Sequence, residues 1–233
     1  MSILPEVTGA WLMHHDHKLS AVKSTAFESI TTAGRAARLL SYISKEEQWS
    51  VSKERIQILA QVNGIRRHEI AGLLSELQNV GVIDKSDSGV SVLGVSQDNL
   101  FKHAAVVFEE QSPSGIERAA LALSEMASLS PVDEVAIADE LADDHKLSKA
   151  EKSELTSLAK SIGFVDYEAI NDKTLLFNGS LFKRENAQKS QIILDGLKDS
   201  ERQNVLEADA RLNSNGCLPE DVIVTILGSS LWS

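Results

Sequence analysis

The sequence has few of the residues that build disulfides, zinc sites or stacking platforms. Its single cysteine, Cys217, excludes an internal disulfide framework and a multi-cysteine zinc site. Two tyrosines and three tryptophans are too few to stack successive bases of single-stranded nucleic acid. No glycine-rich phosphate loop, Walker lysine motif or dinucleotide fingerprint is present, and Asp143-Asp144-His145 lacks a partner nucleophile. We therefore expect neither an enzyme nor a bound cofactor.

Long apolar runs are also missing. The longest ones are too short to cross a bilayer, and the first residues lack the basic region and apolar core of a signal peptide. The hydrophobic content of 42% and the charged content of 24% are those of an ordinary soluble globular protein. These features predict a cytoplasmic protein without a membrane partner.

Charge is unevenly distributed along the 233 residues. The net charge is −11, and this argues against a protein that coats nucleic acid by electrostatics alone. Residues 18–97 carry ten basic and eight acidic side chains, whereas residues 98–233 carry thirteen basic and twenty-four acidic ones. If the chain contacts DNA, the contact is expected in the first of these segments.

The most informative pattern runs from Ser52 to Val95. Hydroxyl caps at Ser50 and Ser52 precede a helix that ends at Asn63-Gly64. A second helix follows, and Gly81 ends it before a strand, a turn at 84–89 and another strand. The apolar positions predicted to be buried are Ile56, Leu59, Ala60 and Val62 in the first helix and Ile70, Leu73, Leu74 and Leu77 in the second.

The second of these helices has a polar outward face, on which small residues permit close approach. A helix, tight turn, helix and hairpin in this order resemble the winged-helix family. That resemblance implies that the second helix enters the major groove of DNA while the hairpin contacts the backbone or minor groove. The residues that this resemblance marks as DNA-binding are Arg66, Arg67, His68, Ser75, Asn79 and Lys85. The alternative is that these residues form the solvated face of a helix in a protein–protein interaction module.

The residues before this pattern supply the first helix of the domain. A helix over Thr25–Ser44 is predicted from Phe27, Ile30 and the apolar or small residues that follow them every three or four positions. Arg35 and Arg38 lie off its apolar stripe, where they would be solvated or would support a phosphate contact. Residues 1–17 are expected to form a polar segment beside a hydrophobic anchor, since four consecutive ligands at 14–17 rarely converge on one metal ion.

The same pattern returns further along the chain. Gly81 and Gly163 are 82 positions apart, and Phe164-Val-Asp166 echoes Val82-Ile-Asp84. This spacing indicates an internal duplication of a whole domain. The second copy's three helices are predicted from Ala119, Ala122, Leu123 and Met126; from Val135, Ala138 and Leu141; and from Leu155, Leu158, Ala159 and Ile162.

The third helix of this copy also has a polar and mildly basic outward face. Its candidate residues are Lys149, Lys152, Ser153, Ser157 and Lys160. Acidic residues crowd the preceding helix between 133 and 144, and they would repel a phosphate backbone. A contact with protein is therefore favoured over a second contact with DNA.

The predicted architecture is mostly helical with small β-hairpins (α+β), built from tandem winged-helix domains. The parts are an N-terminal segment (1–17), a first winged-helix domain (18–96), a connecting helix (97–113), a second domain (114–180) and a helical C-terminal region (181–233). That last region fits a linking helix at 183–197, a first helix with Val205, Leu206, Asp209 and Leu212, and a second helix after Pro219. It reads as a truncated third copy, or as terminal helices of the second.

Two functions follow from this architecture. One is a DNA-binding protein that contacts double-stranded DNA, either a prokaryotic transcriptional regulator or the DNA-targeting adaptor of a larger protein. The other is an acidic scaffold that assembles with a protein partner or with itself without reading DNA. In architecture and charge alone, the chain is similar to the subunits that clasp the linker of chromosome-condensing complexes.

Overall fold

The computed structural model of the chain describes residues 3–20, 25–95, 97–170, 172–182, 196–215 and 219–227. Two compact units are formed, Met1–Leu181 and Phe182–Ser233. Within the described residues the protein is mostly helical, with two small antiparallel three-stranded sheets. This confirms the predicted α+β class. None of the helices in these ranges is both long and apolar enough to cross a bilayer.

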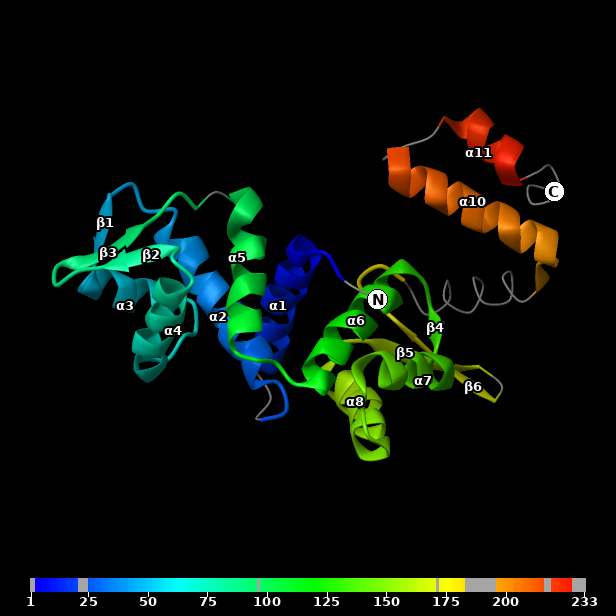
Figure 1. The fold of residues 1–233 in the computed structure, drawn as a ribbon, viewed down its shortest axis with the longest axis horizontal. Helices are drawn as coiled ribbons and strands as arrows, with labels where there is room; N and C mark the ends of the chain where they lie inside the picture. Colours follow the sequence, from blue (N-terminus) through cyan, green and yellow to red (C-terminus); the bar gives the residue numbers. More distant parts are fainter. Residues whose placement is uncertain are drawn as a thin grey trace. The chain divides into compact units, whose positions relative to one another are not determined.

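Three helices pack against one another at the start of the first unit (Figure 1). They are α1 (Pro5–Leu19), α2 (Glu28–Ile43) and α5 (Gln97–Glu110). The close approach of α2 to α1 requires a glycine, because a Cβ atom at Gly34 would lie 2.5 Å from the carbonyl oxygen of Leu12. The apolar positions of all three helices enter one core.

Helix α2 also begins a set of six elements that we call the first module (residues 28–92). After α2 come β1 (Ser50–Ser52), α3 (Lys53–Val62), α4 (Arg67–Asn79), β2 (Ile83–Lys85) and β3 (Gly89–Val92). The sheet has the order β1-β3-β2, with Ser50 opposite Ser91 and Ile83 opposite Val92. Ser52 caps α3 by accepting a hydrogen bond from the Arg55 amide.

A second set of six elements, the second module (residues 115–177), follows in the same order. It consists of α6 (Gly115–Leu129), β4 (Val132–Asp133), α7 (Glu134–His145), α8 (Lys149–Ile162), β5 (Asp166–Ile170) and β6 (Lys173–Phe177). Its sheet has the order β4-β6-β5, the counterpart of the first sheet. Gly81 and Gly163 follow the equivalent helices with φ angles of 74° and 81°, the left-handed conformation that glycine adopts at little cost.

The two modules and α1 share a single apolar core. Phe27, next to α2, and Phe164, next to α8, are both buried, and their ring centroids lie 5.2 Å apart. Helix α1 contacts α2 and α5 on one side and α6 on the other. The first unit is therefore held together by residues that the sequence places in an isolated N-terminal segment.

The prediction for this N-terminal segment was wrong. Residues 5–19 form a helix whose buried positions include His15 and Asp16, both with 0% exposed surface. Leu12, His15, Asp16 and Leu19 follow the i, i+3, i+4, i+7 pattern of a core-facing helix. The two polar residues mask that pattern in the sequence, because their partners come from distant parts of the chain.

Several individual positions also differ from expectation. Val62 is 79% exposed and Val135 is 68% exposed, although both were predicted to be buried; in α7, Ile137 faces the core instead. Strands β1 and β4 were not predicted at all. They are two or three residues long and are defined only by pairing with β3 and β6, so they leave no alternating pattern in the sequence.

The second unit contains two described helices that pack together, α10 (Asp199–Asn215) and α11 (Glu220–Leu227). In α10 the predicted apolar stripe is wrong at two of its four positions: Leu206 is 63% exposed and Asp209 is exposed, whereas Ala208 is buried and Val205 and Leu212 are half-buried. The predicted linking helix lies mainly at 183–195, outside the described residues. Cys217, Asn171 of the second hairpin and the helix expected after Gly228 also lie outside them.

Candidate nucleic-acid interface

Helix α4 presents polar side chains to the solvent, because its three buried apolar residues lie on the opposite side. Ile70, Leu73 and Leu77 are buried against the rest of the first module. Arg66, Arg67, His68 and Asn79, four of the predicted contact residues, are exposed. The face that the sequence predicts to be accessible is therefore accessible.

A groove that we call the first groove runs between α3, α4 and the β2–β3 hairpin, with a volume of about 360 Å³. Its floor is apolar and includes Ile56, Ile70, Leu74 and Val90. Its polar rim comes from all three elements: Lys53 and Gln57, Arg67 and Ser75, and Lys85 and Ser86. Within the rim, the Nζ atom of Lys85 donates a hydrogen bond to Ser75 Oγ over 3.1 Å.

The charge of the first groove is of one sign. Lys53, Arg67 and Lys85 line it, and no carboxylate does so among the described residues. The side chains of Lys53 and Arg67 form no hydrogen bond or ion pair with the part of the chain that the structure describes, and the same is true of Arg66 beside them. Three cations from three elements thus converge on a surface where an anion can approach.

The structure groups the predicted residues unevenly. Arg67, Ser75 and Lys85 line the first groove, and Arg66 lines a neighbouring hollow of about 480 Å³ together with Arg67. His68 and Asn79 line neither. Lys53 and Gln57 were missed. Lys53 follows the Ser52 cap directly. The start of α3 lies beside the hairpin because β1 pairs with β3, and the short sequence of β1 does not predict that pairing.

The equivalent surface of the second module, the second groove, has a volume of about 500 Å³. Ser153, Ser157, Lys160 and Tyr167 line it, but so does Glu134. The carboxylate of Glu134 lies 2.6 Å from Lys160 Nζ, which also lies 5.4 Å from the centroid of the Tyr167 ring. The basic face expected on α8 is therefore partly neutralised.

The other two lysines of that face differ from each other. Lys152 forms an ion pair with Asp139 of α7. Lys149, in contrast, is exposed and has no ion-pair or hydrogen-bond partner among the described residues. The acidic residues of α7 thus reach the outward face of α8 directly, rather than acting only through their general charge.

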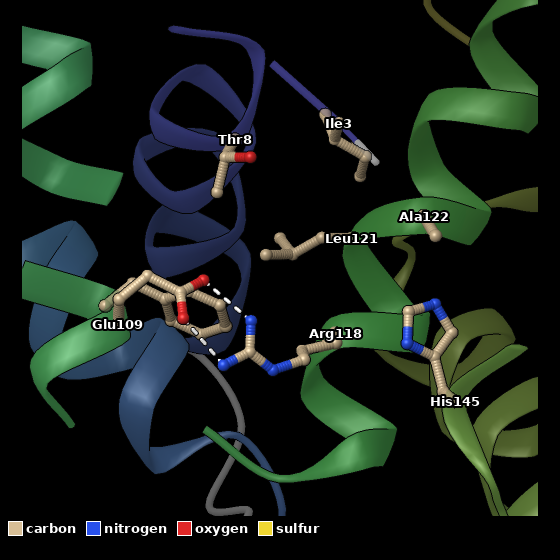
Figure 2. Close-up of a pocket in the computed structure, with 8 residues that line it drawn as sticks. Ile3, Thr8, Glu109, Arg118, Leu121, Ala122 and His145 are labelled. Carbon is tan, nitrogen blue, oxygen red and sulfur yellow. Dashed lines mark hydrogen bonds and ion pairs between the residues drawn. The ribbon is translucent and has the colours of Figure 1, made fainter. Parts of the chain in front are cut away.

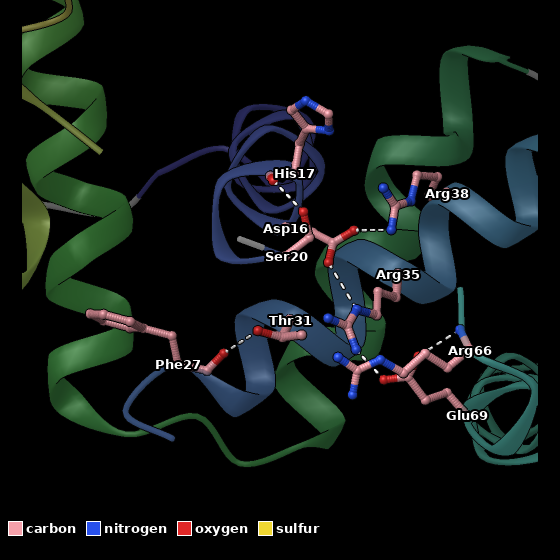
Figure 3. Close-up of polar contacts among 9 residues, drawn as sticks. All are labelled: Asp16, His17, Ser20, Phe27, Thr31, Arg35, Arg38, Arg66 and Glu69. Carbon is pink, nitrogen blue, oxygen red and sulfur yellow. Dashed lines mark hydrogen bonds and ion pairs between the residues drawn. The ribbon is translucent and has the colours of Figure 1, made fainter. Parts of the chain in front are cut away.

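Behind α4, a cluster of charged side chains joins three helices (Figure 3). Asp16 of α1 accepts a hydrogen bond from Arg35 Nε over 3.1 Å and forms an ion pair with Arg38 Nη2 at 2.9 Å. Arg35 also binds Glu69 of α4. Arg35 and Arg38 were expected to be solvated or to contact phosphate, and this is wrong: the buried carboxylate of Asp16 holds both.

Burial and charge oppose each other at Asp16. Desolvation raises the pKa of the Asp16 carboxyl group, and the guanidinium groups of Arg38 and Arg35 offset part of that rise. A buried carboxylate that lost one of these partners would be left with an uncompensated desolvation cost. The two arginines are therefore held in place on the side facing α1.

The junction between α1 and the second module is polar as well as apolar. His15 Nε2 lies 2.8 Å from Ser124 Oγ of α6, and the His15 ring stacks on Phe164 with centroids 3.9 Å apart. Trp11 Nε1 donates a hydrogen bond of 2.7 Å to Glu125. Burial, followed by the charges of His14 and Lys18, holds the pKa of His15 well below its usual value, so the imidazole is neutral near pH 7.

One further cavity, of about 440 Å³, lies where α1, α5, α6 and α7 meet (Figure 2). Arg118 and Glu109 form a two-pronged ion pair across its wall, with distances of 2.7 and 2.6 Å. The guanidinium also lies 5.9 Å from the centroid of the Phe108 ring. Because the carboxylate of Glu109 already satisfies Arg118, this cavity does not offer a free cation to an anionic ligand.

No three His, Cys, Asp or Glu side chains in the described ranges are grouped so that they could hold a metal ion, and His14, His15, Asp16 and His17 are no exception. Comparison of the chain with protein-family models, with curated proteins and with solved structures finds no match.

Proposed function

We propose that the first unit binds double-stranded DNA through the first module, as part of a tandem winged-helix protein. Support for the fold assignment comes from the order of elements. Each module runs helix, strand, helix, helix, strand, strand, and the first strand pairs with the last. A winged-helix domain combines a helix-turn-helix with such a hairpin.

The observation that carries the proposal is the convergence of Lys53, Arg67 and Lys85 on a groove without a carboxylate among the described residues. Each phosphate that a protein neutralises releases condensed counterions, and this supplies most of the affinity of non-specific DNA binding. Arg66 adds a fourth cation next to Arg67. Together these side chains form a compact positive surface on a protein whose overall charge is −11.

In the proposed complex, α4 enters the major groove and the β2–β3 hairpin lies along the backbone. His68, Ser75 and Asn79 lie at or beside this face and carry donors and acceptors suited to base edges, whereas Lys53 and Lys85 suit phosphates. Such a protein acts as a prokaryotic transcriptional regulator or as the DNA-targeting adaptor of a larger protein. It works in the cytoplasm and needs no catalytic group or cofactor.

The test is binding to a random-sequence DNA duplex, titrated from low to physiological salt. Arg66→Ala with Arg67→Ala is expected to weaken binding by roughly tenfold or more and to reduce the salt dependence by about two phosphate contacts. The matched control is Lys149→Ala with Lys152→Ala, which removes two cations from the first turn of the equivalent helix α8. It is expected to leave binding nearly unchanged.

Two outcomes would contradict the proposal. One is the absence of binding by the wild-type chain even at low salt, because non-specific affinity normally accompanies specific DNA recognition. The other is an equal loss of affinity in the two double variants, which would assign binding to overall charge rather than to α4.

A scaffold function is the second candidate, and it is favoured by the second module. There Lys160 and Lys152 are paired with Glu134 and Asp139, so this groove does not attract phosphate as the first one does. A protein partner or a second copy of the chain would suit such a surface. Sedimentation of the purified chain across a concentration series tests self-association, and a constant monomer mass would exclude it. The two functions are compatible, with DNA on one module and protein on the other.

A further inference from the structure

The N-terminal turn of α4 has no side-chain cap of its own. The residue at the cap position is Arg66, whose side chain accepts no hydrogen bond from the helix. Instead Glu69 reaches back, and its Oε2 accepts a hydrogen bond of 2.9 Å from the Arg66 amide. Since four amides at a helix start lack partners within the helix, the position of the Glu69 carboxylate matters for this turn.

Arg35 holds that carboxylate from behind. It contacts Oε1 of Glu69, the oxygen that the Arg66 amide does not use, and on its other side it donates to Asp16 (Figure 3). The exposed fraction of the Asp16 side chain is 0%, so the carboxylate that fixes Arg35 is itself shielded from water. A continuous polar path therefore runs from α1 through α2 to the start of α4.

Helix α1 also joins the second module, through His15 with Ser124 and Trp11 with Glu125. Asp16 follows His15 directly in the same buried helix. The N-terminal turn of α4 is thus connected, through Arg35, to the same helix that contacts the second module.

We propose that Arg35 is a positioning residue for the N-terminal turn of α4, and that Asp16 holds Arg35 for this purpose. The part that concerns DNA rests on the proposed function: Arg35 sets the direction in which Arg66 and Arg67 leave the helix. Arg35 is not assigned a contact with the ligand, because its Nε and Nη1 atoms are held by Asp16 and Glu69.

Arg38 offers a matched control. It lies on the same helix and forms an ion pair with the same Asp16, and the exposed fractions of the Arg35 and Arg38 side chains are 19% and 18%. Among the described residues, Arg38 has no ion pair with α4. Arg35→Gln and Arg38→Gln therefore remove the same charge and each leave Asp16 with one guanidinium, and only the first removes the contact with Glu69.

The measurement is hydrogen exchange of the Arg66 and Glu69 amides by NMR. The Glu69 amide donates to the Arg66 carbonyl oxygen over 3.0 Å, so both amides report on this turn. We expect Arg35→Gln to exchange at least fivefold faster than Arg38→Gln at both amides, with amides of the first turn of α8 unchanged. Glu69→Gln, which keeps an acceptor for Arg66 but loses the ion pair, is expected to resemble Arg35→Gln.

DNA affinity is the second readout. Arg35→Gln is expected to weaken binding at least threefold more than Arg38→Gln while the salt dependence stays the same in both. Equal exchange at Arg66 and Glu69 in the two variants would overturn the positioning role, whatever happens to DNA binding. Failure of the wild-type chain to bind DNA would instead refute the proposed function and leave the exchange result to decide the role of Arg35.

Discussion

The first and second grooves occupy equivalent places in two modules with the same order of elements, and they differ in charge, most directly where a lysine in one module corresponds to a glutamate in the other. Lys53 is the first residue of α3, and Glu134 is the first residue of α7. In the first groove Lys53 adds to Arg67 and Lys85, whereas in the second Glu134 neutralises Lys160. One scaffold thus presents a surface for an anion in one module and a locally balanced surface in the other.

The starts of the two outward-facing helices differ in the same sense. Helix α8 is capped by its own residues: Ser148 Oγ accepts from the Glu151 amide over 3.3 Å, and Glu151 accepts from the Ser148 amide over 2.8 Å. The Ser148 hydroxyl also donates to the Glu151 carboxylate over 2.6 Å, and this hydrogen bond, followed by the one from the Ser148 amide, lowers the pKa of Glu151. In α4 the cap residue is an arginine, and the corresponding carboxylate is held by Arg35. The module with the free cations depends on tertiary contacts for the helix that carries them.

Both modules belong to one folded body with a common apolar core, and the largest expected effect tests this. Phe164→Ala removes a buried ring that stacks on His15 and lies beside Phe27. We expect it to reduce the free energy of unfolding by about 3–5 kcal/mol, the usual cost of such a cavity. Urea denaturation followed by far-UV circular dichroism measures it.

The matched control is Tyr167→Ala, which removes an aromatic side chain that is 52% exposed on the same module. Its effect is expected to stay below about 1 kcal/mol. If Phe164→Ala cost no more than this control, the two modules would be independent bodies, and α1 would not connect them.

The sequence predicts much of each module but little of what joins them. Helix periodicity, Gly64 and Gly81 locate α3, α4 and the hairpin, because these features act over a few residues. The role of α1 is not predictable in this way, since the partners of His15 and Asp16 are 109 and 19 positions away, at Ser124 and Arg35. Their polarity suggests a surface, and only the tertiary contacts make them suitable for a core.

The residues of the candidate site are likewise only partly predictable from the sequence. Arg66, Arg67 and the exposed face of α4 follow from helical geometry alone. Lys53 belongs to the site because β1 pairs with β3 and thereby sets the start of α3 beside Lys85. Similarly, the neutralisation of Lys160 requires a contact over 26 positions with Glu134. Long-range pairing decides which cations are available, and periodicity does not report it.

The pH dependence of stability is the next largest expected effect, and it tests the junction. Because folding lowers the pKa of His15, the unfolded chain takes up a proton below about pH 6.5 while the folded chain does not. The free energy of unfolding is therefore expected to fall as the pH falls below this value, with His15 contributing up to about 1.4 kcal/mol per pH unit. His15→Gln should remove that contribution.

Urea titrations of both proteins between pH 7.5 and 5 provide the measurement. At pH 7.5 the difference in stability reports the loss of packing on Phe164 and of the contact with Ser124. That difference should shrink as the pH falls. Parallel pH profiles for the two proteins would mean that His15 is not kept neutral by the fold.

The smallest expected effects come from exchanging the charges that distinguish the two grooves. Lys53→Glu makes the first groove resemble the second, and it is expected to weaken DNA binding by about tenfold at about 0.1 M salt, the value of one phosphate contact.

Glu134→Lys makes the second groove resemble the first and releases Lys160 from its ion pair. A gain of at most about tenfold in affinity, with a steeper salt dependence, is expected. Glu134→Gln, which releases Lys160 without adding a charge, separates these two contributions. Since the pair of Glu134 and Lys160 is only partly buried, its loss should lower stability by no more than about 1 kcal/mol, and the variants remain comparable with the wild type.

A loss of affinity with Lys53→Glu but no gain with Glu134→Lys would mean that the second module is turned away from DNA when the first is bound. No change in either variant would show that the charge of these grooves does not govern binding.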